Sequence, residues 1–353
     1  MSEKLKSEKP KLPTGFARRM VDWQRQHGRQ SLPWQNTRDP YRVWLSEIML
    51  QQTQVSTVLD YYPRFLQRFP DVAALAAAPQ DDVLGLWSGL GYYSRARNLH
   101  RCAQDVMARF GGAFPSTADQ LVTLSGIGRS TAAAIAAFCF HERSAILDGN
   151  VKRVLTRVLG YGEDLALAAS ERSLWALAEQ LLPPDAADMP AYTQSLMDLG
   201  ATVCLPRKVQ CDGCPVASLC KARQEAQPLA YPVKTRKLKR SSATLWLLWA
   251  VNTQGQVWLH KRPARGIWAG LFSLPVFDDE AALLASCANA GSPRYIGPWK
   301  HVLTHRDLHL HPVQVQVQVQ TPPQCEGQWV DAQDWPQLGL PAPIRLLLDG
   351  QKD

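Results

Sequence analysis

The spacing of apolar residues changes once along this chain, and that change limits the folds it can adopt. From about Phe16 to Arg223, apolar residues recur every three or four positions, as in "VKRVLTRVL" at 151–159. This spacing is typical of helices that bury one face. After Ser241, apolar residues alternate with polar ones, most regularly in "VQVQVQVQ" at 313–320, as expected of a half-buried strand. The sequence therefore predicts a multidomain chain with an all-α region followed by a smaller α+β domain.

The segment between these two regions has the composition of a linker. Residues 224–240 contain two prolines and end in a stretch with five basic residues and no acidic one. Such a segment favours an extended connection that is able to lie along phosphate. We therefore expect a helical region at 16–223 and an α+β domain at 241–349. The charged residues 1–15 predict a disordered N-terminus.

Composition excludes several classes of protein. The chain has 353 residues, of which 46% are hydrophobic, which is enough to build two or three cores and too many for a disordered chain. Its net charge of +8 suits a polyanionic partner without identifying it. The N-terminus lacks the apolar core of a secretory signal, and the longest apolar runs are too short to span a bilayer. We therefore expect a cytoplasmic protein with no membrane partner.

Four cysteines lie close together in "CLPRKVQCDGCPVASLC" at 204–220. In a reducing cytoplasm such a group favours metal binding over disulfides. Zinc sites commonly pair two short knuckles, whereas here only Cys211 and Cys214 are separated by two residues. The longer loops after Cys204 and before Cys220 also suit a larger cluster held by four thiolates. The remaining cysteines are scattered, and we expect no site from them: Cys102, Cys139, Cys287 and Cys325.

Two glycines separate two helical patterns in "LSGIGRSTAAAIA" at 124–136. Gly126 and Gly128 permit a tight hairpin that exposes backbone N–H groups at the start of the second helix, where a phosphate oxygen can bind. An ordinary helix–helix turn is the alternative for two such glycines alone. With Leu124 before them and "RSTAAAI" after them, the stretch favours a helix-hairpin-helix motif, which positions a nucleic-acid backbone without reading its sequence.

One carboxylate interrupts an apolar helix face. In "WLSEIMLQQTQ", Glu47 shares helical spacing with Val43, Trp44, Ile48 and Gln51. Loss of hydration among such residues raises the pKa of a carboxyl group, so that the group can donate a proton near neutral pH. The alternative is a glutamate at the edge of the stripe that pairs with a nearby arginine.

A second carboxylate lies at the start of a helical pattern. In "AILDGNVKRVL", Asp148 follows an apolar pair and precedes residues with helical spacing, which is the position of an N-cap. An ionised carboxylate held there also faces positive charge that develops beside it. If Glu47 and Asp148 meet, an acid and a carboxylate flank a sugar–base bond, as paired carboxylates do in glycosidases. Their distance in sequence does not decide whether they meet.

These motifs together resemble a known superfamily. The hairpin at 124–136, "LDGNVKRV" at 147–154 and the four cysteines are similar to those of the endonuclease III superfamily of DNA glycosylases. Within it, "LPWQ", "WLSEIMLQQTQV", "LWSGLGYYSRARNLH" and "MDLGATVC" resemble the adenine DNA glycosylases, which remove adenine mispaired with 8-oxoguanine. The resemblance covers residues 16–223 densely and the C-terminal domain more loosely.

The resemblance implies roles for the two carboxylates and the cysteines. Glu47 matches the acid that protonates adenine at N7 and later helps to activate water. Asp148 matches the carboxylate that stabilises the oxocarbenium ion, and Asn150 lies beside it in the sequence. The ligands of a 4Fe-4S cluster are matched by Cys204, Cys211, Cys214 and Cys220.

The resemblance also implies contacts to both bases of the mispair. Adenine has to leave the duplex before it is cut, and filling the hole offsets the lost stacking. Gln52 and Tyr92 match residues that enter the base stack beside 8-oxoguanine. The positions around the extruded adenine are matched by Leu32, Trp34, Leu50 and Gln194.

One position predicts hydrolysis without strand cleavage. Lyase members of the superfamily carry a lysine two residues after the second hairpin glycine, and that lysine forms a Schiff base with the sugar. This chain has Ser130 there, and a hydroxyl group cannot form an imine. We therefore expect a monofunctional glycosylase that uses water. Lys152 is a candidate for residual lyase activity, but we favour a lysine that faces solvent or phosphate.

The C-terminal domain resembles the Nudix-related domain that ends adenine DNA glycosylases. "GIWAGLFSLPVF" is not followed by the Arg-Glu and paired Glu that bind magnesium in Nudix hydrolases, so we expect a recognition module. The Phe-Ser-His loop with which the family inspects 8-oxoguanine is matched by Leu303, Thr304 and His305. The change from Phe to Leu keeps an apolar side chain and removes its aromatic face. We expect the other histidines of "HVLTHRDLHLH" in strands and loops rather than at a metal.

The expected function is removal of adenine opposite 8-oxoguanine or guanine in double-stranded DNA, by a monomer bound to the nucleoid of a bacterial cytoplasm. Two alternatives remain. One is another glycosylase of the superfamily, which acts on mismatched thymine or uracil or cleaves the strand. Ser130 opposes the lyase, and the C-terminal domain opposes the short mismatch enzymes. The other is a non-enzymatic DNA-binding protein that holds zinc at the four cysteines.

Overall fold

A computed structural model describes residues 11–235, 239–288 and 290–350 of the chain. Residues 1–10 of the predicted N-terminal tail lie outside the described residues, as do residues 236–238 of the predicted linker. In the part of the chain that the structure describes, no helix is both long enough and apolar enough to cross a membrane.

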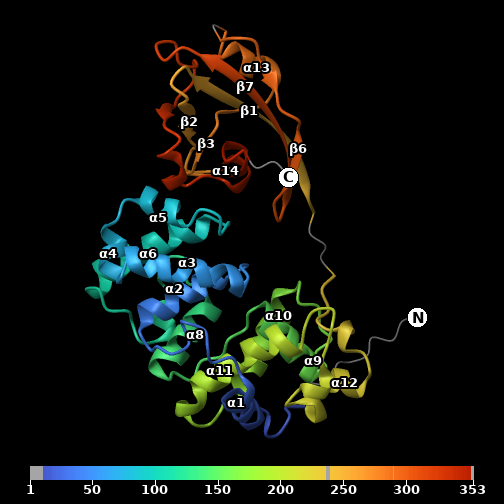
Figure 1. The fold of residues 1–353 in the computed structure, drawn as a ribbon. Coiled ribbons are helices and arrows are strands. Elements are labelled where there is room, and N and C mark those ends of the chain that lie inside the picture. Colours follow the sequence, from blue (N-terminus) through green and yellow to red (C-terminus); the bar gives the residue numbers. More distant parts are fainter. Residues whose placement is uncertain (1–10, 236–238, 289, 351–353) are drawn as a thin grey trace. The chain divides into compact units, whose positions relative to one another are not determined.

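The chain folds into two compact units, and its middle segment leaves the first unit and returns to it (Figure 1). Unit 1 combines Met1–Gln52 with Asp105–Lys237, and unit 2 combines Thr53–Gln104 with Leu238–Asp353. Unit 2 therefore joins a helical segment from the first half of the chain to all of the C-terminal strands.

Unit 1 is helical and packs around one apolar core, to which Phe16, Ala133, Val154, Leu174 and Leu196 contribute from five different helices. Short 3₁₀ or π turns connect several of its helices. Its α-helices are α1 (Phe16–His27), α2 (Pro40–Leu50), α7 (Ala118–Leu121), α8 (Arg129–Phe140), α9 (Gly149–Leu159), α10 (Ala168–Gln180), α11 (Met189–Asp198) and α12 (Lys221–Gln224). Its short turns are η1 (Ala186–Asp188), η2 (Leu199–Val203), η3 (Cys211–Gly213), η4 (Ala217–Leu219) and η5 (Pro228–Ala230).

Helix α9 shows how local sequence sets these boundaries. It begins after Asp148, whose side chain accepts hydrogen bonds from the N–H groups of Asn150 and Val151, so the orphan donors of the first turn are satisfied. It ends at Gly160, which adopts a left-handed conformation with φ of 62°, as a helix C-terminus commonly requires.

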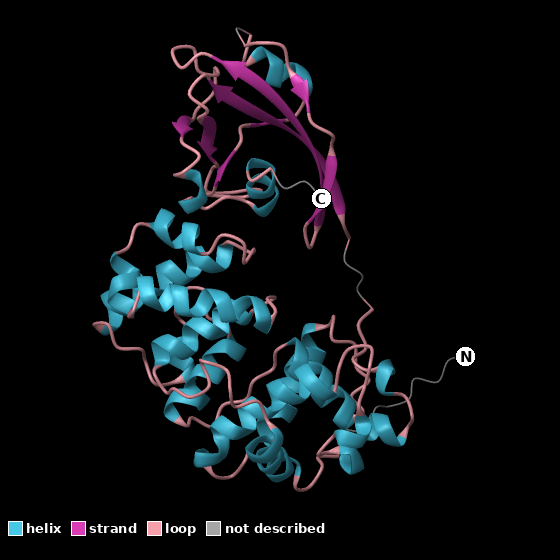
Figure 2. Cartoon of the chain, in the orientation of Figure 1, coloured by secondary structure: helices cyan, strands magenta, loops and turns pink. Residues whose placement is uncertain are grey.

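Unit 2 combines helices with a mixed sheet. Helix α6 crosses the boundary between the units at its C-terminal end. Figure 2 shows that the strands of the described residues all belong to the C-terminal part. The helices are α3 (Val55–Arg68), α4 (Val72–Ala77), α5 (Gln80–Leu86), α6 (Ser94–Phe110), α13 (Glu280–Ala285), η6 (Trp335–Gln337) and α14 (Ala342–Leu348). The strands are β1 (Ser241–Asn252), β2 (Val257–Lys261), β3 (Phe272–Ser273), β4 (Val276–Phe277), β5 (Arg294–Tyr295), β6 (Trp299–Val302), β7 (Arg306–Val317) and β8 (Gln328–Val330).

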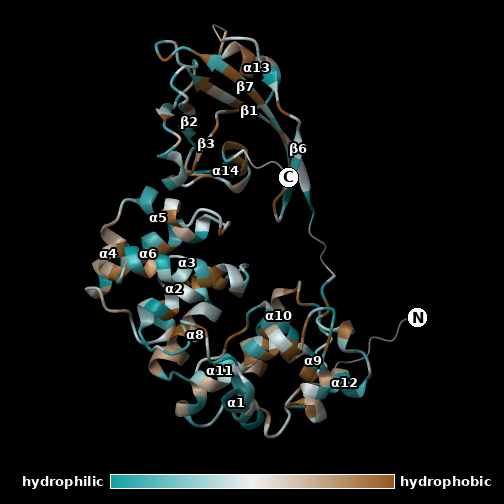
Figure 3. Cartoon of the chain, viewed as in Figure 1, coloured by the Kyte–Doolittle hydropathy of each residue, from teal (hydrophilic) through white to brown (hydrophobic). Residues whose placement is uncertain are grey.

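Strands β1 and β7 form the centre of the sheet, whose order is β3-β2-β1-β7-β5. They are parallel and pair along their full length, from Ser241 with Arg306 to Asn252 with Val317. Along β7 the side chains alternate between the two faces of the sheet, and most of the buried ones are apolar. Figure 3 shows hydrophobic and hydrophilic residues interspersed along the strands. One face packs with α14 through Ile344 and Leu347, and the other packs with α13 through Leu283.

The predicted fold class is confirmed in its architecture: the described elements before residue 241 are helices, and a mixed sheet with a few helices follows. The strand expected at 313–320 is displaced, because β7 begins at Arg306 and ends at Val317. Its N-terminal half reads "RDLHLH", in which histidines occupy the polar positions, and β1 and β6 pair with that half. The predicted boundaries of the domains stay a prediction.

Candidate active site and nucleic-acid interface

Glu47 lies on α2, a helix whose neighbouring residues Trp44 and Ile48 are buried. Burial and, to a smaller extent, the negative charge of Asp148 together raise the pKa of the Glu47 carboxyl group to about 8. Within the described residues, no lysine or arginine forms an ion pair with Glu47. The alternative of a surface glutamate paired with an arginine is therefore not the arrangement found, and the carboxyl group carries its proton at neutral pH.

Asp148 caps α9 and also faces Glu47. Its Oδ1 accepts hydrogen bonds of 2.8 Å from both Asn150 N and Val151 N, bonds that stabilise the ionised form of a carboxylate. The cap therefore does not use Oδ2. Since the charge of Asp148 acts on the pKa of Glu47, the fold brings together two carboxyl groups that lie about a hundred residues apart. The Glu47 carboxyl group favours the neutral form. The Asp148 carboxyl group is held at the start of α9 by two backbone N–H groups.

Asn150 connects this pair to the cysteine region through Arg153. The Arg153 guanidinium group donates to Asn150 Oδ1 over 2.9 Å, to Gly200 O over 2.6 Å and to Cys204 O over 2.9 Å. Arg153 is only 8% exposed, so these bonds stand in for water at a buried charge. Sequence reasoning missed this residue. Its position on the helix between apolar residues is the only signal that points to it.

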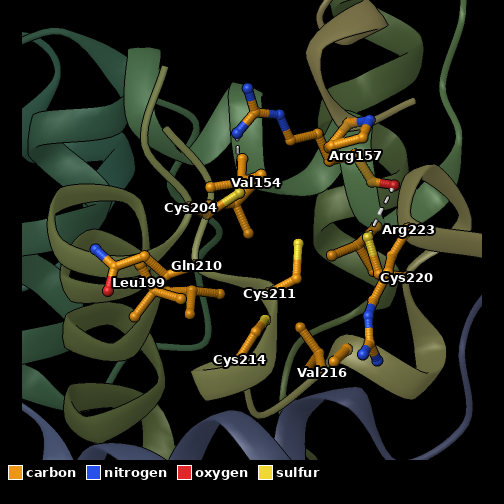
Figure 4. A pocket seen from close by; sticks show the side chains of 15 residues that line it. Val154, Arg157, Leu199, Cys204, Gln210, Cys211, Cys214, Val216, Cys220 and Arg223 are labelled. Carbon is orange, nitrogen blue, oxygen red and sulfur yellow. Dashed lines mark hydrogen bonds between the residues drawn. The ribbon is translucent and has the colours of Figure 1, made fainter. Parts of the chain in front are cut away.

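The four cysteines line one pocket of unit 1 (Figure 4). They lie at the ends of three short elements, because Cys204 follows η2, Cys211 begins η3, Cys214 follows η3 and Cys220 precedes α12. Burial raises the pKa of the Cys214 thiol to about 11, and the other three cysteines contribute to that rise. The sulfur atoms of all four residues therefore lie near one another.

Arg157 supports the rim of this cysteine pocket. It is 2% exposed, and its Nη1 donates to Cys204 Sγ over 3.2 Å and to Leu205 O over 2.8 Å. A second donor, Nη2, reaches Pro206 O over 3.3 Å. The loop that follows Cys204 is thereby fastened to α9. Arg207 and Lys208, which extend that loop, are exposed.

The cysteines are available as metal ligands, since all eight cysteines of the chain are free thiols. Within the described residues, no group of three or more His, Cys, Asp or Glu side chains is placed to hold one metal ion.

The predicted hairpin joins α7 to α8. Gly126 has a φ of 77°, which is a left-handed conformation that favours glycine. Gly128 is the N-cap residue of α8, and the open space around it would accept a side chain. The start of α8 therefore presents backbone N–H groups beside a small residue, as an anion site at a helix N-terminus requires.

The residues expected around a base lie on unit 1. Leu32 and Gln35 form a turn in which Gln35 N donates to Leu32 O over 3.0 Å, and Trp34 within that turn is buried. Leu50, at the end of α2, is partly buried. Gln194 on α11 is partly exposed.

Gln194 is oriented by an aspartate that sequence reasoning missed. Its Nε2 donates to Asp198 Oδ1 over 2.9 Å. Arg29 holds the same carboxylate with its Nε and Nη2 over 2.7 and 2.6 Å. Because a carboxylate only accepts hydrogen bonds, the amide nitrogen of Gln194 faces Asp198 and its oxygen faces elsewhere. The one-turn spacing of 194 and 198 was the available signal.

Ser130 lies where a lyase would carry lysine. Its Oγ accepts a hydrogen bond of 3.0 Å from Leu147 N, directly before Asp148. Lys152 on α9 is held elsewhere, because its Nζ lies 2.7 Å from Glu171 Oε1. The lysine is therefore paired with a carboxylate and partly exposed, and its role stays a prediction.

Gln52 and Tyr92 share an uncommon local geometry. Their φ angles are 59° and 47°, in the left-handed region that non-glycine residues rarely occupy. Both side chains are exposed, and Tyr92 is 46% exposed. Exposed residues with strained backbone often mark functional positions. Each was expected to enter a base stack.

Thr304 and His305 form the exposed turn between β6 and β7. The hydroxyl groups of Thr304 and Tyr92 share a hydrogen bond of 2.8 Å. Leu303, in the same turn, packs against the apolar core of the sheet. The structure therefore joins Thr304 to Tyr92 within unit 2, and it gives Leu303 a packing role.

Two family models match the chain and define its class. Residues 45–180 match the HhH-GPD superfamily of base excision DNA repair proteins, and residues 246–350 match a NUDIX domain. The first match contains both carboxylates and the hairpin, and the second contains the β6–β7 turn. Fold and site therefore define a helix-hairpin-helix base excision repair protein with a Nudix-like domain.

Similar proteins of known activity narrow this class. An adenine DNA glycosylase of Buchnera aphidicola subsp. Baizongia pistaciae is 37% identical over 302 residues, which cover 84% of this chain and 85% of that protein. The adenine DNA glycosylase of Mus musculus is 46% identical over 223 residues, which cover 61% of this chain and 43% of the mouse protein. The chain belongs to the adenine DNA glycosylase family.

Solved structures agree with this fold. A thermostable thymine-DNA glycosylase matches with a TM-score of 0.53 and 28% identity, over 60% of this chain and 95% of that chain. An endonuclease III in a non-covalent DNA complex matches with a TM-score of 0.51 over 61% of this chain and 99% of that chain. At 19% identity the second likeness concerns the fold alone.

Proposed function

We propose that this chain removes adenine opposite 8-oxoguanine, or opposite guanine, from double-stranded DNA by hydrolysis of the N-glycosidic bond. The observation that carries the proposal is the pair of Glu47 and Asp148. Glu47 has a pKa raised to about 8 and therefore keeps its proton at neutral pH. Asp148 is held at the start of α9 by two backbone hydrogen bonds.

The two carboxyl groups divide the chemistry between them. Glu47 donates its proton to N7 of adenine, which makes the base a better leaving group as the bond to C1′ lengthens. Asp148 stabilises the positive charge that develops on the sugar, in a setting where its own hydrogen bonds hold it in place. Glu47, now ionised, then accepts a proton from the water that attacks C1′. Asn150, held by Arg153, supports the position of Asp148.

The base-binding roles follow the family pattern. The extruded adenine lies among Leu32, Trp34, Leu50 and Gln194. Gln52 and Tyr92 fill the space beside 8-oxoguanine, and their exposed, left-handed positions support this assignment. Thr304 and His305 contact 8-oxoguanine from the β6–β7 turn. Gly126 and Gly128 bind a phosphate of the DNA backbone.

The four cysteines hold a 4Fe-4S cluster. The support is that all four thiols line one pocket and that the loops after Cys204 and before Cys220 are longer than those of a paired zinc knuckle, which suits a cluster held by four thiolates. When bound, the cluster supplies four metal–thiolate bonds that cross-link α12 and the loops on either side of Cys211. The chain's own Arg157 fastens the first of these loops to α9, and Arg207 and Lys208 extend from it toward a DNA phosphate.

The chain acts without strand cleavage. Ser130 cannot form an imine, and its hydroxyl group positions the backbone beside Asp148. Lys152 forms an ion pair with Glu171, so we assign it no part in the reaction. The functional division is a glycosylase region at 16–223 and a recognition domain at 241–349.

The direct test is a glycosylase assay on three duplexes. They carry A opposite 8-oxoguanine, T opposite G, and thymine glycol, and each reaction is analysed with and without alkali. We expect nicking of the first duplex alone, and only after alkali. Cutting at T opposite G would assign the chain to the mismatch enzymes, and nicking without alkali would make it a lyase. Zinc in place of iron on elemental analysis would contradict the cluster.

A further inference from the structure

The loop that carries Tyr92 (residues 88–93, here the Tyr92 loop) has an uncommon backbone. The side chains of Trp87 and Arg95 hold the carbonyl groups of Leu90 and Gly91 through bonds of 3.1 to 3.2 Å. Gly89, Gly91 and Tyr92 have φ angles of 102°, 71° and 47°. Left-handed residues persist where surrounding contacts impose them, and the tyrosine is the one for which that conformation is unfavourable. The loop therefore needs anchors on both sides of Tyr92.

The side chains of Ser88 and Tyr93, on either side of the loop, both donate hydrogen bonds to one carbonyl group of the C-terminal domain. Ser88 Oγ donates to Leu340 O over 3.1 Å, and the Tyr93 hydroxyl donates to the same oxygen over 2.7 Å. Leu340 is fully buried. The two residues that flank the loop are thus tied to a single point, and both lone pairs of that carbonyl are used.

Further bonds saturate this cluster. Arg345 Nε donates to Ser88 Oγ over 3.2 Å, and Arg345 Nη2 donates to Leu338 O over 2.9 Å. Tyr93 accepts a bond of 3.3 Å from Gly89 N. Tyr61 on α3 donates to Ser88 O over 2.7 Å. The hydroxyl groups of Ser88 and Tyr93 each both donate and accept. The cluster therefore resists rearrangement, because a change leaves a partly buried polar group unpaired.

The backbones also meet directly beneath the loop. A Cβ atom on Gly85 of α5 would lie 2.1 Å from Gln337 O, and one on Gly339 would lie 2.9 Å from Leu84 Cβ. Neither glycine has a positive φ, so close approach is what requires them. The C-terminal segment 337–345 therefore packs against α5 without intervening side chains.

We propose that segment 337–345 positions the Tyr92 loop for insertion into DNA, and that Tyr93 and Ser88 are the positioning residues through which it acts. The proposal rests on the proposed function, because it concerns the step in which Tyr92 enters the base stack. The C-terminal domain then contributes to mispair recognition in two ways: through its exposed turn at Thr304, and through a buried carbonyl that shapes a loop of the helical part.

The test uses the full chain with the variants Tyr93→Phe and Ser88→Ala, and with Ser88→Thr as the conservative replacement. The control is Lys261→Ala. Lys261 forms an ion pair of 2.7 Å with Asp81 between the same two parts of unit 2, but outside the cluster. Three quantities are measured: the single-turnover excision rate of adenine opposite 8-oxoguanine, the affinity for that duplex, and the fluorescence of 2-aminopurine placed beside 8-oxoguanine.

We expect Tyr93→Phe to lower both the excision rate and the fluorescence rise about tenfold, since one buried hydrogen bond is lost. Ser88→Ala behaves similarly, Ser88→Thr restores most of the signal, and Lys261→Ala stays within about twofold of the parent. A merely structural role would lower the melting temperature without changing the fluorescence of the folded complex.

The outcomes separate this inference from the function on which it rests. A parent chain that leaves adenine in place overturns the proposed function. Excision and fluorescence at parental levels in both Tyr93→Phe and Ser88→Ala overturn the positioning role alone. If Tyr93→Phe loses cooperative melting, Ser88→Ala decides in its place, because it removes the other donor to the same Leu340 carbonyl group.

Discussion

Glu47 lies on a helix among buried side chains, whereas Tyr92 is an exposed residue that follows two glycines, Gly89 and Gly91, in a loop. In the first setting the protein changes the chemistry of a side chain, because burial moves the pKa of a carboxyl group by several units. In the second setting the protein fixes the position of a side chain, through a left-handed backbone conformation at Tyr92. The two regions therefore divide catalysis and recognition by solvent exposure.

The supports of the two regions differ in the same way. Asp148 and Asn150 are held by backbone N–H groups and by the buried Arg153. The Tyr92 hydroxyl group shares a hydrogen bond with the exposed Thr304. Buried bonds lose more free energy when one partner is removed than exposed bonds do. Substitutions in the first region should consequently have the larger effects, and the following predictions test that ranking.

Replacement of Glu47 by Gln should have the largest effect. The amide keeps the size of the side chain and has no acidic proton to give, so we expect the single-turnover rate to fall by about 10³-fold or more. Affinity for the mispaired duplex should stay within about threefold, since binding uses other residues. Glu163→Gln, a change at an exposed glutamate, serves as the control and should keep the parental rate. A rate for Glu47→Gln within tenfold of the parent would remove Glu47 from its role.

Replacement of Arg153 by Met should have the next largest effect. It leaves three acceptors without their donor, on Asn150, Gly200 and Cys204. We expect a loss of about 2–4 kcal/mol in the free energy of unfolding, measured by urea denaturation, because the Arg153 side chain is buried and makes three bonds at once. The matched control is Arg143→Met. Arg143 donates to one carbonyl group, that of Pro183, from an exposed position, so its loss should be under about 1 kcal/mol. Equal losses for the two variants would contradict the ranking.

The pH dependence of excision should follow Glu47. A raised pKa means that the folded protein keeps the neutral acid up to about pH 8. The rate should be nearly constant below that value and fall about tenfold for each pH unit above it. The free energy of unfolding should depend on pH in the same direction. Between pH 4.5, the ordinary pKa of a glutamate, and about pH 8, folded Glu47 keeps a proton that the unfolded chain has released. Its contribution to stability is therefore lost as the pH rises through this range. Both effects should be absent from Glu47→Gln, and a downturn in that variant near pH 8 would assign the titration to another group.

The sequence predicted the parts of the molecule that depend on local pattern. Apolar spacing and its change after residue 240 gave the helical region and the α+β domain, which the fold confirms. Asp148 was predicted as an N-cap because capping needs only the next three residues. The four cysteines were grouped because they are neighbours in the sequence, and they line one pocket.

Contacts between distant segments were not predictable in this way. Nothing in "GLGYYSRARN" indicates that Tyr93 bonds a carbonyl group some 250 residues later, since a backbone acceptor has no sequence signature. Arg153 and Arg157 read as the polar edge of a helix, and only the fold shows that they are buried. The strand β7 began earlier than its alternation suggested, because its first half is paired with β1 and β6 rather than marked by apolar residues.

The smallest effect should come from Thr304→Ala, which removes the hydroxyl group that pairs with Tyr92. An exposed hydrogen bond contributes about 1 kcal/mol or less, so we expect the ratio of excision rates for A opposite 8-oxoguanine and A opposite guanine to narrow by about two- to fivefold. Thr304→Ser should restore the ratio, and Thr253→Ala, in the β1–β2 turn, should leave it unchanged. If Thr304→Ala instead lowered excision as far as Glu47→Gln does, exposure would not separate recognition from catalysis. The turn would then belong to the reacting centre, because an exposed hydrogen bond alone cannot account for a loss of that size.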